Sequence, residues 1–158
     1  MHDDLARVRQ AVDLATANVG RSGGPFGAIV VRGDEVVGRG ANRVTADLDP
    51  TAHAEVVAIR EACRRVGDFS LAGSTLYTSC EPCPLCLSAA LWSRLDGVVW
   101  AADRDAAARA GFDDAQFYEL LRPAPPDASW PLRLVHLPVE TSEAPFDAWR
   151  ALEDRIPY

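Results

Sequence analysis

The chain has 158 residues, of which 48% are hydrophobic and 25% charged, as in one ordinary globular domain and unlike a disordered chain. A formal net charge of −7 produces a field that repels polyanions, which disfavours nucleic acid and favours a small or neutral ligand. No apolar run has membrane length, and the first 20 residues lack the pattern of a signal peptide, so we expect a cytoplasmic protein with no membrane partner.

Helices and strands are predicted in alternation along the first half of the chain. A helix over 1–20 precedes a buried strand over 28–31, a turn at Gly33 and a return strand over 35–40. A polar loop is expected over 42–49. Asp49 supplies the start signal of the next helix, which Gly67 ends.

From Ser74 onward the pattern is that of a βαβ unit, followed by further helices and one strand. The unit consists of strands over 75–78 and 98–101 with a helix over 85–91 between them. The elements expected after it are helices over 103–110 and 115–121, a proline-rich loop over 123–131, a strand over 132–137 and a helix over 145–153.

Two short motifs place metal-binding side chains at the starts of two predicted helices. The first is His53-Ala54-Glu55, and the second contains Cys83 and Cys86. Two cysteines three residues apart face the same way, and a positive helix end prepares their thiols to bind metal. One His and two Cys are typical of an open catalytic zinc whose fourth position holds water. Glu55 is too close to His53 in sequence for a second ligand, and its carboxylate is predicted to shuttle protons.

A structural zinc is the alternative, and it requires a fourth protein ligand. Cys63 lies ten residues beyond His53, about 15 Å along a helix, and is too far away. Cys80 is nearer, but a closed site would leave Glu55 without a role. His136 falls in an apolar strand pattern and is interpreted as a core histidine, and His2 lies at the terminus. Three cysteines within seven residues favour metal binding over disulfides, which indicates a reducing compartment.

These motifs resemble those of the cytidine deaminase superfamily of zinc hydrolases. Further segments narrow the resemblance to the bacterial guanine deaminases, and the Gly-Phe-Asp-Asp piece discriminates best. The segments that carry it are 24–27, 49–55, 77–83 and 110–114.

The resemblance implies a three-layer α/β/α sandwich around a mixed five-stranded sheet. It implies hydrolysis of guanine to xanthine and ammonia, with one zinc per chain held by His53, Cys83 and Cys86 and with Glu55 as the proton shuttle. The partners implied are a small nucleobase and a second copy of the chain, in a homodimer whose segment 143–158 is exchanged between subunits.

The resemblance also implies the residues that contact the substrate. Asn42 and the backbone of Ala54 would hydrogen-bond the ring, and Phe26 and Trp92 would form apolar walls. Two residues from the last third of the chain complete the set: Asp114 would contact the purine and assist proton transfer, and Tyr158 would close the partner's site.

Each of these residues has an alternative interpretation without a functional role. Asn42 fits a turn, Phe26 and Trp92 fit a core, and an aspartate after a Gly-Phe turn fits a helix cap. A terminal tyrosine on a short tail, Tyr158, is normally disordered.

Other substrates also remain open: cytosine, ammeline or a related triazine, and guanosine. A tRNA adenosine deaminase is disfavoured by the acidic charge, and a non-catalytic zinc domain is the alternative from a different class. If Tyr158 closes the site, little room remains for ribose, which favours the free base.

Overall fold

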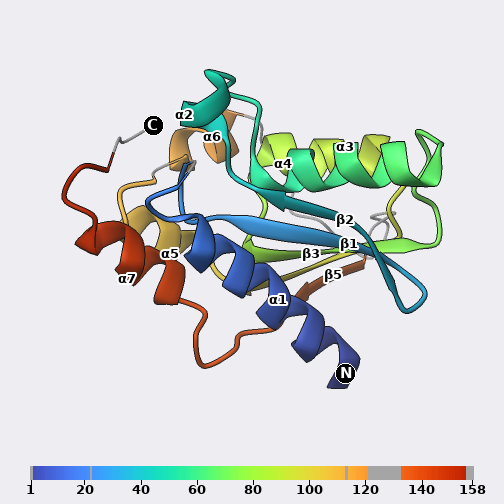
Figure 1. Cartoon of the computed structure of the whole chain (residues 1–158), viewed down its shortest axis with the longest axis horizontal. Coiled ribbons are helices and arrows are strands. Elements are labelled where there is room, and N and C mark those ends of the chain that lie inside the picture. The colour runs from blue at the N-terminus through green and yellow to red at the C-terminus, as the bar shows by residue number, and fades with distance from the viewer. Residues whose placement is uncertain (1, 22, 113, 121–132, 156–158) are drawn as a thin grey trace.

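The computed structural model describes residues 2–21, 23–112, 114–120 and 133–155 (Figure 1). These residues form a five-stranded sheet with the strand order β2-β1-β3-β4-β5. β1 is antiparallel to β2 and β3, whereas β3, β4 and β5 are parallel to one another, so the sheet is mixed as expected. The strand bounds are β1 Gly27–Arg32, β2 Glu35–Ala41, β3 Ser74–Cys80, β4 Gly97–Ala102 and β5 Arg133–His136.

Helices cover both faces of the sheet and give the three layers that the resemblance implied (Figure 1). On one face α3 and α4 lie side by side, and on the other α1 packs across the strands, with α7 and α5 at its end. Short helices α2 and α6 lie at one end of the molecule. The bounds are α1 His2–Asn18, α2 Val44–Asp47, α3 Ala54–Val66, α4 Pro84–Trp92, α5 Arg104–Arg109, α6 Ala115–Leu120 and α7 Ala144–Ala151.

Strand β1 is apolar over residues 27–31 because both of its faces are buried there. Ala28 and Val30 join the core beneath α3 and α4, and Ile29 and Val31 join the core beneath α1. A strand buried on both faces gives a continuous apolar run instead of alternation. The predicted βαβ unit is confirmed by the parallel pairing of β3 with β4.

Two boundaries differ from the sequence prediction around residues 42–54. The expected loop contains the one-turn helix α2, whose ends are joined by an ion pair between Arg43 and Asp47 of 2.6 Å. α3 begins at Ala54 instead of Asp49, because the Asp49 carboxylate accepts bonds from the backbone N–H and hydroxyl of Thr51 in a local turn. The predicted stop is confirmed: Gly67 caps α3 in the left-handed conformation, with φ of 74°.

The remaining predicted elements are found near their expected places. α7 packs on its own chain, with Phe146 and Trp149 buried beside α5. The proline-rich segment 123–131 lies outside the described residues. No helix in the described part of the chain is long and apolar enough to cross a membrane.

Candidate metal centre and pocket

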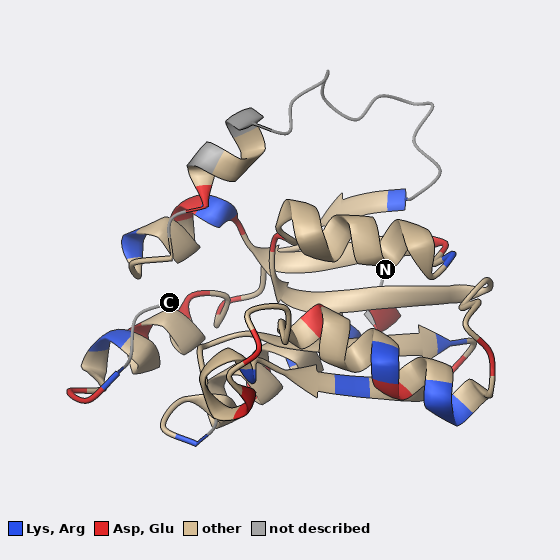
Figure 2. Cartoon of the chain, turned by 90° about the horizontal axis from the view of Figure 1, so that it is seen from above, with Lys and Arg blue, Asp and Glu red and all other residues tan. Residues whose placement is uncertain are grey.

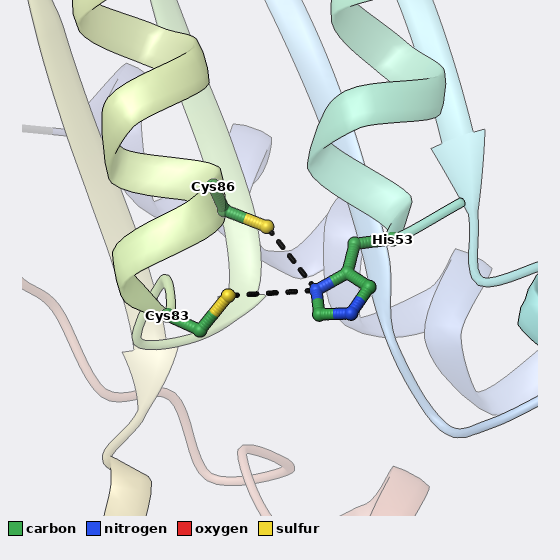
Figure 3. A group of neighbouring side chains, drawn as sticks. All are labelled: His53, Cys83 and Cys86. Carbon is green, nitrogen blue, oxygen red and sulfur yellow. Dashed lines mark hydrogen bonds between the residues drawn. The ribbon is translucent and has the colours of Figure 1, made fainter. Parts of the chain in front are cut away.

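The three predicted metal ligands meet where α3 and α4 begin (Figure 3). His53 is the residue before α3, Cys83 the residue before α4, and Cys86 lies in the first turn of α4. The Nδ1 atom of His53 lies 3.5 Å from the Cys83 sulfur and 3.4 Å from the Cys86 sulfur. The two predicted helix starts therefore bring the ligand atoms to one point.

The spacing of these atoms fits a single zinc ion. With Zn–S of about 2.3 Å and Zn–N of about 2.05 Å, tetrahedral geometry separates a sulfur from a nitrogen by about 3.5 Å. The two observed N···S distances, 3.5 and 3.4 Å, agree with that value. Two soft thiolates and an imidazole are also the donor set that zinc prefers.

The thiols at this centre differ in their readiness to ionise. Hydrogen bonds from Cys86 and His53 lower the pKa of Cys83 to about 4, so that Cys83 is a thiolate at neutral pH. The pKa of Cys86 is raised by its hydrogen bond to Cys83 and by its burial. The contact with Cys83 also raises the pKa of His53.

Glu55 lies beside the ligand group but is not one of its members. Its side chain is 5% exposed and lines the same pocket as His53 and Cys83. Burial raises the pKa of this carboxyl, which favours a group that takes up and releases a proton. The Thr78 hydroxyl on β3 lies 3.4 Å from Glu55 Oε1 and also 3.4 Å from the backbone oxygen of Gly27.

No fourth protein ligand completes the group among the described residues. The Cys80 thiol is buried and donates to the backbone oxygen of Asp103 at 3.5 Å, and the Cys63 thiol contacts the oxygen of Phe69. His136 lies on the edge strand β5, exposed and bonded to the oxygen of Ala101 at 2.7 Å, so the expected buried core position is wrong. A three-residue group leaves room for a non-protein ligand, as a catalytic site requires.

A cavity of about 650 Å³ opens over the metal centre. Most of its wall is apolar, and Phe26 contributes to it, held edge-on against Phe112 with ring centroids 4.9 Å apart. Asn42 and Asp114 supply polar groups. A cavity with an apolar wall and a few converging polar groups is typical of small-molecule sites.

Asn42 is fixed in one orientation by backbone groups of the turn before β1 and of the start of α2. Its Oδ1 accepts from the backbone N–H groups of Gly24 at 3.4 Å and Val44 at 3.1 Å. Because both neighbours are donors, the oxygen of the amide must face them, and the NH₂ group is left for another acceptor. The side chain is 2% exposed, so that acceptor would be a molecule in the cavity.

The other predicted site residues are placed unequally. Ala54 is the first residue of α3, between two pocket residues, where a backbone N–H has no partner within the helix. Tyr158 lies outside the described residues. Trp92, predicted to form an apolar wall, is 78% exposed and does not line this pocket in the single chain, so its role stays a prediction. It is the last residue of α4, seven residues and about 10 Å along the helix from the pocket residue Leu85.

Two glycines of β2 set the distance between the sheet and α3. A Cβ on Gly40 would lie 2.1 Å from the backbone oxygen of Ala54, and one on Gly38 would lie 2.3 Å from that of Ala58. Only a residue without a side chain permits this approach, which places the start of α3 and His53 at the pocket. Gly38 and Gly40 alternate with other residues along the strand, and this pattern in the sequence could have indicated the close approach of α3.

Several residues of the site were not predicted. Thr78 beside Glu55 is one of them, and the pair formed by Glu81 and Arg104 at the pocket is another, with 3.3 Å between the charged groups. Phe117 of α6 and Leu85 of α4 line the opening. No local spacing pattern distinguishes these residues from ordinary surface or core positions.

Comparison with known proteins places this site in a family. The model of the cytidine and deoxycytidylate deaminase zinc-binding region matches residues 1–102. The guanine deaminase of Bacillus subtilis is 43% identical over 152 residues, 96% of each chain. Its crystal structure superposes with a TM-score of 0.72 at 41% identity, covering 97% of both chains.

Two further matches are informative. A solved structure in complex with 2,6-diaminopurine has a TM-score of 0.82 at 27% identity, covering 98% of this chain and 85% of its own. The tRNA-specific adenosine deaminase of Aquifex aeolicus is 45% identical, but over 78 residues, 49% of this chain and 52% of its own. With its His/Cys/Cys group, mixed sheet and matching family model, the chain belongs to the cytidine and deoxycytidylate deaminase family of zinc-binding proteins.

Proposed function

We propose that this chain is a guanine deaminase, which hydrolyses the exocyclic C–N bond of guanine to give xanthine and ammonia. The observation that carries the proposal is a buried carboxyl, Glu55, beside a three-residue zinc-type ligand group at the base of a largely apolar pocket. The match to a guanine deaminase along nearly the whole chain supports guanine as the substrate.

The residues of the centre divide the chemistry between them. His53, Cys83 and Cys86 would hold one zinc, which would supply an activated water at the pocket. Glu55 would carry two protons in turn from the attacking water, the first to the ring nitrogen and the second to the departing amine, which leaves as ammonia. Its raised pKa suits both steps, because a weaker acid holds the proton long enough to transfer it.

Other pocket residues orient the base. The NH₂ group of Asn42 donates to a ring acceptor, and the backbone N–H of Ala54 is the second donor proposed. Phe26 packs against the ring plane, and Asp114 contacts the purine and assists proton transfer. A guanine ring carries donors and acceptors along its edge, which this mixture of groups can satisfy.

The alternative substrates are less well supported. The tRNA adenosine deaminase matches half of this chain, and the net charge of −7 opposes binding of a phosphate backbone. Guanosine, cytosine and ammeline share the chemistry, and the purine-bound relative favours a purine over the two single-ring compounds.

We also propose a cytoplasmic homodimer in which residues 1–158 of each subunit form one deaminase domain. All four cysteines are free thiols, which suits a reducing compartment. α4 carries no charged residue, in contrast to α3 beside it (Figure 2), and it exposes Leu85 and Trp92 to solvent. An exposed apolar helix face is typical of a subunit interface. Exchange of residues 143–158 between subunits stays a prediction.

The test is an ammonia-release assay with guanine, guanosine, cytosine and ammeline, using the wild type and Glu55→Gln. We expect guanine to be the best substrate, and Glu55→Gln to lower kcat by about 10²–10⁴-fold with zinc content unchanged. The matched control is Glu61→Gln on the same helix, whose carboxylate accepts from the Arg39 backbone away from the pocket. A zinc-loaded wild type that releases no ammonia from guanine would contradict the proposal.

A further inference from the structure

Helix α6 joins the pocket to the turn that carries the metal ligands. Asp114 and Phe117 line the cavity, and the backbone oxygen of Asp114, the residue before α6, accepts from the Phe117 N–H at 2.9 Å. Of the α6 side chains that the structure describes, those of Ala115 and Phe117 are exposed. These two contribute little apolar burial, so polar contacts help to place the helix.

Tyr118 makes such contacts from the same helix turn as Asp114. Its hydroxyl donates to the backbone oxygen of Pro82 at 3.0 Å, immediately before the ligand Cys83. Its ring lies under the Arg104 guanidinium, with 4.5 Å between the guanidinium carbon and the ring centroid. Tyr118 is half-buried, so the hydroxyl gives up part of its hydration for the Pro82 contact.

Arg104 is itself anchored to the metal-binding turn. Its guanidinium lies 3.3 Å from Glu81 Oε1, and its backbone N–H donates to Glu81 Oε2 at 3.1 Å. Glu81, Pro82 and Cys83 are consecutive in the sequence. The Pro82 oxygen and the Arg104 guanidinium therefore both connect Tyr118 to the same turn. Arg104 begins α5, whose cap is the Asp103 carboxylate.

We propose that Tyr118 is a positioning residue that aligns Asp114 with the metal centre by bracing α6 against the Glu81–Cys83 turn. This inference rests on the proposed function, because it assigns the alignment of Asp114 to the same deamination. Tyr118 is not among the residues that line the pocket or among the three metal-ligand residues. Its effect passes through the orientation of Asp114, which is four residues earlier and thus on the same side of α6.

The test compares Tyr118→Phe, which removes only the hydroxyl, with Tyr77→Phe as the matched control. Tyr77 donates to Asp4 at 2.8 Å on the opposite face of the sheet, so its variant loses a similar hydrogen bond far from the pocket. We expect Tyr118→Phe to lower kcat for guanine about fivefold, the worth of one neutral hydrogen bond, with KM and zinc content unchanged. Tyr77→Phe should keep its kcat.

A double-mutant cycle separates positioning from a general structural role. If Tyr118 acts through Asp114, Tyr118→Phe causes no further loss of kcat in an Asp114→Asn background. Equal losses in both backgrounds, or a full kcat in the single variant, would overturn the proposal.

Hydrogen exchange provides a readout that needs no substrate. Amides of α6 should exchange faster in Tyr118→Phe than in the wild type and in Tyr77→Phe, and equal exchange would overturn the bracing role. A wild type that fails to deaminate guanine would overturn the proposed function, while the exchange result still decides whether Tyr118 braces α6.

Discussion

Replacement of Gly40 by alanine tests whether the spacing between β2 and α3 sets the geometry of the metal centre. The added Cβ would lie 2.1 Å from the Ala54 oxygen and 2.5 Å from the Ala58 nitrogen, both backbone atoms of α3. An ordinary carbon–oxygen contact is about 3.3 Å, so the start of α3 must retreat by about 1 Å. Ala54 lies between His53 and Glu55, and both side chains move with it.

The expected effect on activity exceeds the effect on folding. Overpacking of this kind costs about 1–3 kcal/mol of unfolding free energy. A displacement of about 1 Å at reacting groups costs about 10²-fold in rate, so kcat for guanine should fall by that order and zinc content should drop. Denaturant unfolding, ammonia release and bound zinc are measured on the same preparation.

Gly33→Ala is the matched control for a purely conformational cost. Gly33 lies in the β1–β2 turn with φ of 58° and no atom within 4 Å of an added Cβ. Alanine there costs about 1–2 kcal/mol through backbone strain alone, without touching α3. We expect reduced stability with normal kcat and zinc. If Gly40→Ala also keeps its kcat and zinc, β2 does not set the position of His53 and the reasoning fails.

Three further predictions concern metal, substrate and assembly. Bound zinc should be released as the pH falls, because protons compete with the metal for the imidazole of His53 and the thiolates of Cys83 and Cys86. A dye-chelator titration checks this, and zinc that stays bound until the chain unfolds in acid would contradict it. Asn42→Asp keeps the acceptor for Gly24 and Val44 but loses the NH₂ donor, so KM for guanine should rise about 3–10-fold; burial of the carboxylate also lowers the unfolding free energy, which is measured separately, and an unchanged KM would remove Asn42 from the binding site. Trp92→Ser should lower the molar mass measured by light scattering from two chains toward one, and an unchanged mass would place the interface elsewhere.

The metal centre could be predicted from the sequence because its geometry is local. Cys83 and Cys86 are three residues apart at a helix start, and the position of His53 relative to Glu55 is fixed by the start of a second helix. Cys63 could be excluded as a fourth ligand from its distance along the sequence. Cys80 could be doubted because a closed site leaves Glu55 without a role, and its thiol donates to the backbone oxygen of Asp103. Spacing along one helix thus constrains a site strongly, since 3.6 residues make a turn.

The contacts between segments could not be predicted in the same way. Tyr118 meets Arg104 and Pro82 only because β3 and β4 are neighbours in the sheet, which no single segment encodes. Trp92 is a different case: resemblance assigned it a role in the site, and in the single chain it lies exposed at the far end of α4 from the pocket.

The edge of the sheet explains why the pocket residues are so widely spread along the chain. Phe26 precedes β1, Asn42 follows β2, Glu81 follows β3 and Arg104 follows β4 closely, and all four line one cavity. β1 enters the sheet at the edge where the other three strands leave it, because it is antiparallel to both β2 and β3. Ligand sites of open α/β sheets lie beyond the carboxyl ends of the strands, where polar backbone and helix starts converge. Substitutions at Phe26 and Asn42 can therefore change substrate choice while the buried strands keep their places, whereas Glu81 and Arg104 also hold the turn that leads to Cys83.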